Sequence, residues 1–505
     1  MKKTQQLFLC LVFASSLALQ AQTLRDVSRY SNISPQGDGR FMAMGGAFGA
    51  LGGNVSAMSI NPAGSSVFLY PEISVSAQLL NRQIESSYFS NEETSSTDHF
   101  RIPQFGGVFV VEDSNSSDWT KLSFGFNIQR VQDFNQTYRV IGDNPSRGLD
   151  QYFLGYARNN ELSVLELRDG ETYGDAYAEI GELFGYGAQQ AFLGYQGYMI
   201  NPLSYTDTNV NYTSNAAYNR LNHDYYFNST GYHRKYTFNF STTYKNRFHL
   251  GININTHQIE YDETNDLEER GYSSNSGVQF SKFTNELNSL GRGVSMDIGA
   301  IVLYNQFRFG MSYQSPTWFS FVDEGKQSLE VDYVENETTQ TEIIAPGVIN
   351  GYPEYELRTP SKITMSAAYT YKKRALIAVD FGTQNPQNSR FEPTTDSYFS
   401  ALNDEIKNAF VRGNFLRLGT ELRLNDQVSL RGGFRSENAL QRGALEEDRS
   451  YSLGVGYDMG ASALNIALVQ SERRVNYELY NIGLTDNYYL NVRPLQIIAT
   501  YVLRL

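Results

Sequence analysis

The feature that most constrains this chain is a series of short alternating segments whose connections are in turn short and long. Each segment places apolar residues two apart with polar or small residues between them, which is the period of a β-strand. The predicted strands are 72–85, 100–112, 119–133, 232–244, 247–261, 292–304, 307–314, 361–371, 374–385, 412–424, 427–437, 449–458, 462–472 and 493–505. The short connections are 113–118, 245–246, 305–306, 372–373, 425–426 and 459–461, and the long ones are 86–99, 134–231, 262–291, 315–360, 386–411, 438–448 and 473–492.

This alternation of connections is typical of bacterial outer-membrane barrels, which have an even number of strands, tight turns on one side and long outer loops on the other. An even strand count also places both termini on the side of the short turns. We therefore predict an all-β fold, a transmembrane antiparallel β-barrel of about 14 strands.

The charges within the strands favour a barrel over a soluble sandwich. In the segment 412–424, Leu416, Leu418 and Leu422 alternate with Arg417 and Glu421. A sandwich core would have to bury these charges, whereas a barrel has lipid outside and a hydrated lumen inside.

The composition agrees with this interpretation. The chain has 36 Tyr and 31 Phe among 505 residues, although its mean hydropathy is only −0.42. A barrel needs aromatic girdles at both membrane interfaces and apolar residues at only every second position. The net charge of −13 argues against nucleic acid as a partner.

The first residues predict secretion. Lys2 and Lys3 precede an apolar run at 7–19, and small residues suitable for cleavage follow, so we assign 1–22 as a signal peptide. After it, no apolar run approaches the length of about 20 residues that a membrane helix needs. Cys10, the only cysteine, lies inside this signal, which leaves the mature chain without disulfides or thiol ligands.

Catalytic motifs are missing from the sequence. Five histidines occur, and none lies in a nucleophile motif or an HExxH motif. We therefore expect no enzyme activity, no catalytic residues, no cofactor and no metal.

The segment 45–64, GGAFGALGGNVSAMSINPAG, differs from the strands that follow it. Its glycines permit tight turns, and it ends in Asn61, Pro62, Ala63 and Gly64. An ordinary glycine-rich turn is the alternative. The ending resembles the hatch of the outer-membrane long-chain fatty-acid transporter family (FadL/TodX-like), in which an N-terminal segment with an Asn-Pro-Ala motif fills the barrel. In the family, acidic residues precede this motif. Residues 53–57 of this chain contain no Asp or Glu, so we expect no hatch salt bridge from these positions.

This resemblance implies a domain organisation. Residues 23–70 would form the hatch, and 71–505 the transmembrane barrel with a long extracellular loop at 134–231. It also implies a monomer in the outer membrane of a Gram-negative bacterium, surrounded by outer-membrane lipid and inserted by the barrel-insertion machinery. The amphipathic last strand fits the signal that this machinery reads.

Within the long loop, apolar residues recur at four-residue spacing between residues 176 and 193, which predicts an amphipathic helix. The residues proposed for substrate capture are Ile180, Leu183, Phe184, Ala188 and Phe192. In the family, helices on long outer loops carry a hydrophobic groove for the substrate. The alternative is that this stripe packs on the barrel rim as a small core.

Two further constellations concern the path through the barrel. Proline and glycine interrupt or bulge a strand ladder, so Pro103, Gly106, Gly107 and Gly125 are candidates for a lateral opening in the wall, or else for an ordinary irregularity.

Among the lumen-facing charges, Arg417 and Arg431 are candidates for holding a carboxylate headgroup, or for a paired network that fills the barrel.

The sequence thus predicts an outer-membrane transporter for passive uptake of a hydrophobic small-molecule substrate, with long-chain fatty acids as the main expectation. A docking or shuttle protein for secreted proteins is the alternative, and an adhesin or a polar-solute porin is a third.

Overall fold

The structure is a computed structural model that describes residues 22–31, 33–112, 117–372, 374–442 and 447–505. The predicted signal peptide lies outside the described residues, apart from Gln22.

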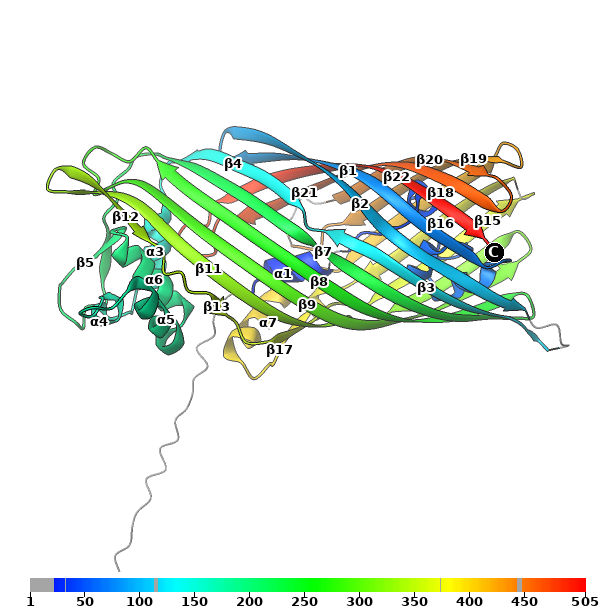
Figure 1. Cartoon of the computed structure of the whole chain (residues 1–505), viewed down its shortest axis with the longest axis horizontal. Coiled ribbons are helices and arrows are strands. Elements are labelled where there is room, and N and C mark those ends of the chain that lie inside the picture. The colour runs from blue at the N-terminus through cyan, green and yellow to red at the C-terminus, as the bar shows by residue number, and fades with distance from the viewer. Residues whose placement is uncertain (1–21, 32, 113–116, 373, 443–446) are drawn as a thin grey trace, which may run out of the picture.

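Fourteen long strands form one closed antiparallel barrel, which confirms the predicted fold class and all of the predicted strands (Figure 1). The first and last strands pair from Glu72 with Arg504 to Ser87 with Tyr489, and this pairing closes the barrel. In spatial order the strands are β1 (Glu72–Tyr88), β2 (Asn91–Glu112), β3 (Trp119–Asp133), β7 (Leu221–Tyr244), β8 (Phe248–Arg270), β9 (Val278–Tyr304), β10 (Phe307–Gln314), β15 (Lys362–Tyr371), β16 (Ala375–Gln384), β18 (Gly413–Arg423), β19 (Val428–Asn438), β20 (Glu447–Asp458), β21 (Ser462–Glu478) and β22 (Asn487–Arg504).

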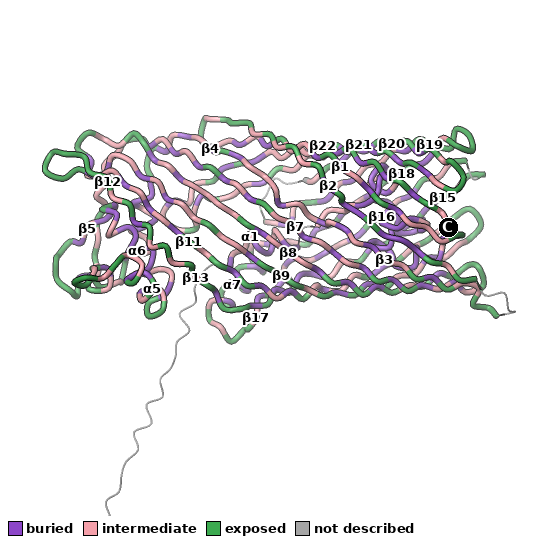
Figure 2. The backbone as a smooth tube through the Cα atoms, viewed as in Figure 1, coloured by how far each residue is buried: buried purple, intermediate pink, exposed green. Residues whose placement is uncertain are grey.

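An apolar belt surrounds the barrel. Exposed and buried residues alternate along the strands (Figure 2), and most of the exposed ones near the short turns are apolar. The chain has two tryptophans, and both lie at the edges of this belt with exposed rings, Trp119 near the short turns and Trp318 on the side of the long connections. Trp and Tyr are enriched at both interfaces of a membrane. The closed barrel and its belt make this chain a transmembrane barrel of the bacterial outer-membrane type.

The wall continues beyond the belt on the side of the long connections. Here β4 (Gln136–Asn144) pairs with β7, and β11 (Trp318–Glu335) pairs with β9. The smaller strands of this region are β12 (Thr338–Ile344), β13 (Asn350–Gly351), β14 (Tyr355–Arg358) and β17 (Arg390–Glu392). The predicted loop 134–231 therefore contains β4 and the first half of β7. The alternation of apolar and polar residues is weak in these two segments. Above the membrane the outer face of a strand is in water, so it is polar like the face towards the lumen.

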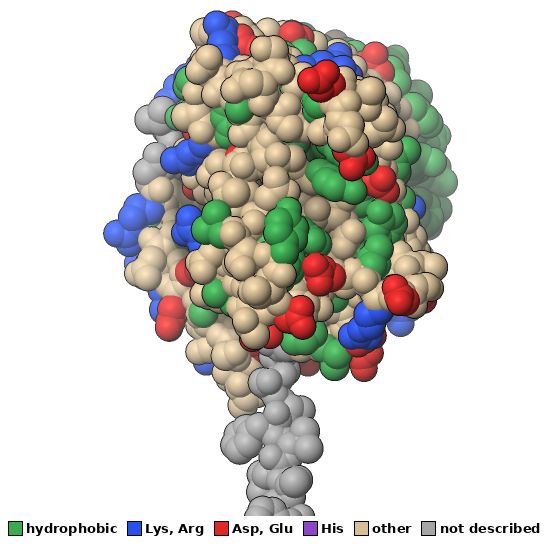
Figure 3. Space-filling view, turned by 90° about the vertical axis from the view of Figure 1, so that its left-hand side faces the viewer, with side chains coloured by type: hydrophobic (Ala, Val, Ile, Leu, Met, Phe, Trp, Pro, Cys, Tyr) green, Lys and Arg blue, Asp and Glu red, His purple; other side chains and the backbone are tan. Residues whose placement is uncertain are grey.

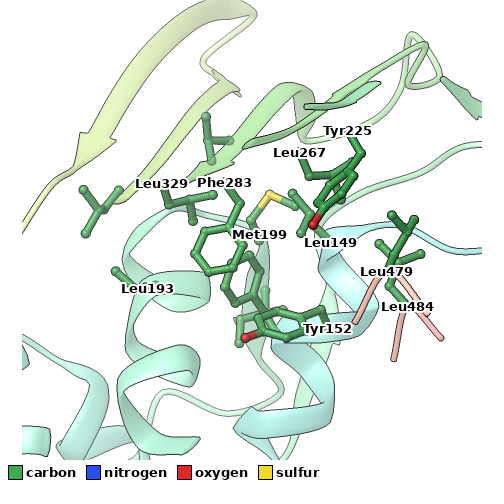
Figure 4. Packing of buried hydrophobic residues seen from close by; sticks show 14 of the residues in the cluster. Leu149, Tyr152, Leu193, Met199, Tyr225, Leu267, Phe283, Leu329, Leu479 and Leu484 are labelled. Carbon is green, nitrogen blue, oxygen red and sulfur yellow. The ribbon is translucent and has the colours of Figure 1, made fainter. Parts of the chain in front are cut away.

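Helices cover this end of the barrel (Figure 1), and Figure 3 shows the surface of the same end. They are α3 (Leu149–Ala157), α4 (Leu162–Leu165), α5 (Tyr173–Phe184) and α6 (Tyr186–Gln196), with the hairpin of β5 (Ile200–Pro202) and β6 (Tyr212–Ser214), while α7 (Ser397–Ala409) and the 3-10 turn η3 (Pro386–Asn388) lie at the side. The helices pack on the strands through a continuous apolar core, in which Phe283 and Leu329 of the wall meet Tyr152 and Leu193 (Figure 4). None of the described helices is long and apolar enough to cross a membrane.

The N-terminal segment lies inside the barrel, and we refer to residues 22–71 as the hatch. It contains α1 (Leu24–Ser31), α2 (Gly39–Ala43) and two short 3-10 helices, η1 (Ser56–Ser59) and η2 (Pro62–Val67). Its residues from Phe41 to Ile60 form a small apolar cluster with lumen-facing Ala368, Ala378 and Ala467. The fold thus has a barrel with a filled lumen.

Candidate functional site

The Asn61–Gly64 motif fastens the hatch to the wall. The Asn61 side chain is fully buried and donates from Nδ2 to the carbonyl of Gly49 at 2.7 Å and to that of Ala300, on β9, at 3.1 Å. Its Oδ1 accepts from the amide of Ala63 at 3.1 Å, which caps η2. One side chain therefore fixes a hatch loop, the start of a helix and the barrel wall together.

Glycines in the wall make room for the hatch, a feature that the sequence analysis did not recognise. A Cβ atom at Gly299 would lie 2.0 Å from Asn61 Oδ1, and one at Gly251 would lie 2.4 Å from the carbonyl carbon of Pro62. Further wall glycines with a hatch atom within 2.6 Å of an added Cβ are Gly125, Gly310, Gly419, Gly433 and Gly454. The sequence does contain a signal for these contacts: on several strands, a glycine occupies a position that faces the lumen.

Ion pairs also hold the hatch. Arg40 donates to both carboxylate oxygens of Glu421, at 2.9 and 3.2 Å, and Arg431 donates to Glu421 at 2.6 Å and to Asn465 at 2.8 Å. Bidentate charge-assisted bonds are strong and directional. The structure thus places Arg431, a candidate for a headgroup contact, in a paired network beneath the hatch.

Arg417, the other candidate, lies elsewhere in the lumen. It is 1% exposed, its guanidinium stacks 4.2 Å from the ring centroid of Phe415, and its nearest carboxylate, Glu437, is 3.9 Å away. It lines a cavity of about 110 Å³. The two arginines are therefore not brought together in one site.

A larger cavity lies in the lumen between α1 and the walls of β1, β3, β4 and β21. Its volume is about 280 Å³, near the lower end of small-molecule sites. Its apolar lining is Leu80, Val131, Phe134, Tyr138, Phe227, Tyr261, Val475, Tyr477, Leu490 and Val492.

Positive charge exceeds negative charge around this cavity. It is lined by Arg25, Arg29, Arg82, Arg101, Arg435 and Arg473, against Asp133, Glu263 and Asp448. Each acid has an arginine partner, namely Arg101 with Asp133 at 2.6 Å, Arg29 with Glu263 at 3.2 Å and Arg435 with Asp448 at 3.3 Å.

Two of these arginines donate to backbone carbonyls instead of carboxylates. Arg82 donates to the carbonyls of Asp133, at 3.1 Å, and of Asn135. Arg25 donates to the carbonyl of Glu478 and lies 4.8 Å from the ring centroid of Tyr477. Among the described residues, neither has a carboxylate within 4.0 Å. The cavity therefore combines apolar walls with two arginines that form no ion pair with a carboxylate of the described residues. Neither residue could be identified from the sequence, because the two come together only through the fold.

The cavity reaches a seam in the wall. The ladder of β2 and β3 runs from Glu112 opposite Lys121 to Gln104 opposite Gln129 and ends beside Pro103. Beyond that point β4 pairs with β7, and side chains link it to β1, for example through the Ser86 hydroxyl and the carbonyl of Arg139 at 2.5 Å.

The other residues considered for a lateral opening lie below the seam. Gly106 and Gly107 are within the paired part of the ladder, and Gly125 faces the hatch, where an added Cβ would lie 2.5 Å from the sulfur of Met58. Of the four candidates, Pro103 is the one at the end of the ladder.

The predicted capture helix is two helices. Gly185, with φ +82°, ends α5 and precedes α6, so the four-residue spacing does not form one continuous stripe. Ile180 is buried in the core of the cap, with Ala188 and Phe192. Leu183 and Phe184 are 52% and 46% exposed.

The described residues hold no group of three or more His, Cys, Asp or Glu placed to bind a metal ion.

Comparison with known proteins supports the fold. No protein-family model matches the sequence, and no curated protein matches it. A FadL homologue of Pseudomonas aeruginosa is similar in structure, with a TM-score of 0.55, 10% identity and coverage of 94% of this chain and 99% of that one. The toluene transporter TodX of P. putida has a TM-score of 0.51 at 12% identity, with the same coverage of both chains. The monoaromatic hydrocarbon channel CymD has a TM-score of 0.50 at 9% identity, again with that coverage. The chain thus has the FadL/TodX-type fold, which confirms the structural resemblance expected from the Asn-Pro-Ala motif.

Proposed function

We propose that this chain is a passive outer-membrane transporter for apolar molecules that carry a carboxylate, with long-chain fatty acids as the principal substrate class. One observation carries the proposal: the lumen cavity has apolar and aromatic walls together with Arg25 and Arg82, which have no carboxylate partner among the described residues. An arginine binds a carboxylate through charge-assisted hydrogen bonds.

The same observation distinguishes two kinds of cargo. The solved structures of similar fold include a toluene transporter and a monoaromatic hydrocarbon channel. Toluene is neutral and interacts with a guanidinium only through a weak cation–π contact, whereas a fatty-acid carboxylate loses its hydration on entering the cavity and needs a compensating partner. The excess of arginine therefore supports an anionic amphiphile over a neutral hydrocarbon.

The proposed path begins at Leu183 and Phe184, the exposed members of the apolar pattern on the cap. It continues to the cavity and leaves the barrel through the seam beside Pro103, so that the acyl chain reaches lipid without crossing water. Passive transport agrees with the sequence, which shows no clear energy-coupling motif.

Binding to the purified protein tests this function. We expect Arg82→Gln with Arg25→Gln to weaken dodecanoate binding by about tenfold or more, since each charge-assisted hydrogen bond contributes about 1.5–3 kcal/mol. Arg474→Gln is a matched control, because this arginine is exposed on the outer face of β21, away from the cavity. Dodecanol and toluene should bind both variants as they bind the wild type. Unchanged dodecanoate affinity in the double variant would contradict the proposal.

A further inference from the structure

A second charged surface lies on the outer face of the barrel, around Trp318. This tryptophan begins β11 at the outer edge of the apolar belt and is 44% exposed. Its neighbours across the strands are Val294 of β9 and Arg358 of β14. The Arg358 guanidinium carbon lies 5.8 Å from the centroid of the Trp318 ring. Because tryptophan marks the membrane interface, this surface lies at the depth of lipid headgroups.

Three exposed arginines gather here. Arg358 lies directly opposite Arg390 of β17, and Arg292 of β9 lies opposite Ser320, two residues along β11 from Trp318. Within the described residues, no carboxylate oxygen lies within 4.0 Å of any of these three guanidinium groups. Like charges directly opposite each other on neighbouring strands destabilise a sheet. The pair formed by Arg358 and Arg390 therefore carries a repulsion that an anion between its members would relieve.

The acidic residues of this region lie one step farther from the belt. Glu356 is opposite Glu392, and Glu354 accepts a hydrogen bond from the Ser320 hydroxyl. On β14 and β17 the arginines thus lie nearer the apolar belt and the glutamates farther from it, whereas Arg292 lies in the same cross-strand row as Ser320 and Glu356. In a lipid, the phosphate lies directly above the acyl chains, which is the depth of Arg358 and Arg390.

A shallow groove of about 590 Å³ runs through the same surface. Its lining crosses the edge of the belt, from Val294 and Trp318 to Arg292 and Glu356. Gly293, between Arg292 and Val294, contributes no side chain to it. Arg358 and Arg390 do not line the groove, but Arg358 lies directly opposite Trp318, which does. An acyl chain along the apolar part of the groove would therefore place its phosphate-bearing headgroup next to these arginines.

We propose that this surface is a binding site for a phosphate-bearing lipid of the outer leaflet. Arg358 and Arg390 hold the phosphate between them, Arg292 provides a third cationic contact, and the apolar end of the groove receives the upper part of an acyl chain. The site lies outside the barrel, so the proposal does not rest on the cargo of the lumen.

Native mass spectrometry of the full mature protein, titrated with phosphatidylglycerol in detergent, tests the site. We expect Arg358→Gln with Arg390→Gln to weaken binding of this lipid by about tenfold or more, since two charge-assisted hydrogen-bonding partners are removed. Arg474→Gln, which removes an exposed arginine of β21, should bind like the wild type. Equal affinity of the double variant and the wild type would overturn the proposal.

Two further binding experiments distinguish a phosphate-bearing lipid from other ligands. A phosphate-free diglucosyl lipid should bind weakly to wild type and double variant alike, and tight binding to the wild type would assign the site to the sugar or the acyl chain instead. Inorganic phosphate alone at millimolar concentration should not raise the thermal midpoint, and a rise equal to that given by phosphatidylglycerol would refute a lipid site.

Stability in lipid-free detergent separates binding from folding. Because the double variant removes a like-charged cross-strand pair, we expect it to be at least as stable as the wild type there, and less stabilised when phosphatidylglycerol is added. A double variant that is less stable than the wild type without lipid would show that the arginines serve the fold, and would contradict the proposal.

Discussion

Asn61→Ala should release the hatch without unfolding the barrel. The substitution removes the two shortest bonds that Asn61 donates, to the carbonyls of Gly49 and Ala300, and one that it accepts from the amide of Ala63, all at a side chain that is 1% exposed. A buried hydrogen bond contributes about 1 kcal/mol net, so three of them amount to about 3 kcal/mol. This corresponds to an increase of about 100-fold in the population of the undocked hatch.

Hydrogen–deuterium exchange of the purified protein measures this effect. Peptides from residues 39–67 should exchange about 100-fold faster in Asn61→Ala, whereas peptides from β8 and β21 should keep the rates of the wild type. Asn81→Ala is the matched control, because Asn81 makes its hydrogen bonds on the exposed outer face, to Ser96 and Asp98. Exchange of the hatch at the wild-type rate would refute the role assigned to Asn61, and equally faster exchange throughout the barrel would refute the independence of the hatch.

Three further predictions follow from the path and the wall. Gly299→Val places side-chain atoms where Asn61 Oδ1 now lies, since an added Cβ would be 2.0 Å away, and should raise ion conductance in planar bilayers; conductance like that of the wild type would show that the hatch does not need this close contact. Pro103→Val restores a backbone donor where the ladder of β2 and β3 ends and should lower fatty-acid uptake several-fold, whereas normal uptake would count against a lateral opening here. Leu183→Ser with Phe184→Ser changes two exposed side chains and should raise the substrate concentration for half-maximal uptake without altering the thermal midpoint; an unchanged uptake curve would remove the capture site from the path.

The strands within the membrane could be predicted from the sequence because lipid and a hydrated lumen impose opposite polarities on the two faces. In β18, for example, Leu418 and Leu422 face lipid while Arg417 and Glu421 face the lumen. Above the membrane this contrast is lost, so β11 was predicted as part of a loop. The break at Gly185 was not predicted, because a four-residue spacing continues in the sequence even where the helix ends.

The cavity could be predicted only in part. The hatch motif was evident because its residues are adjacent in the sequence. Arg25 and Arg82, in contrast, lie on α1 and β1, and only the docking of the hatch brings them to one cavity. Arg417 and Arg431 were considered because charges stand out in a strand, yet each lies in a different part of the lumen. The alternation of residues along a strand indicates which of them face the lumen, but it does not indicate which of these residues come into contact there.

Uptake of radiolabelled oleate by a Gram-negative strain that lacks its own fatty-acid transporter tests the central claim most directly. We predict that this chain restores saturable oleate uptake, that Arg82→Gln with Arg25→Gln reduces it about tenfold at low substrate concentration, and that toluene uptake is unaffected by the two substitutions. Oleate uptake at the level of the empty vector, with the barrel folded in the outer membrane, would contradict the account.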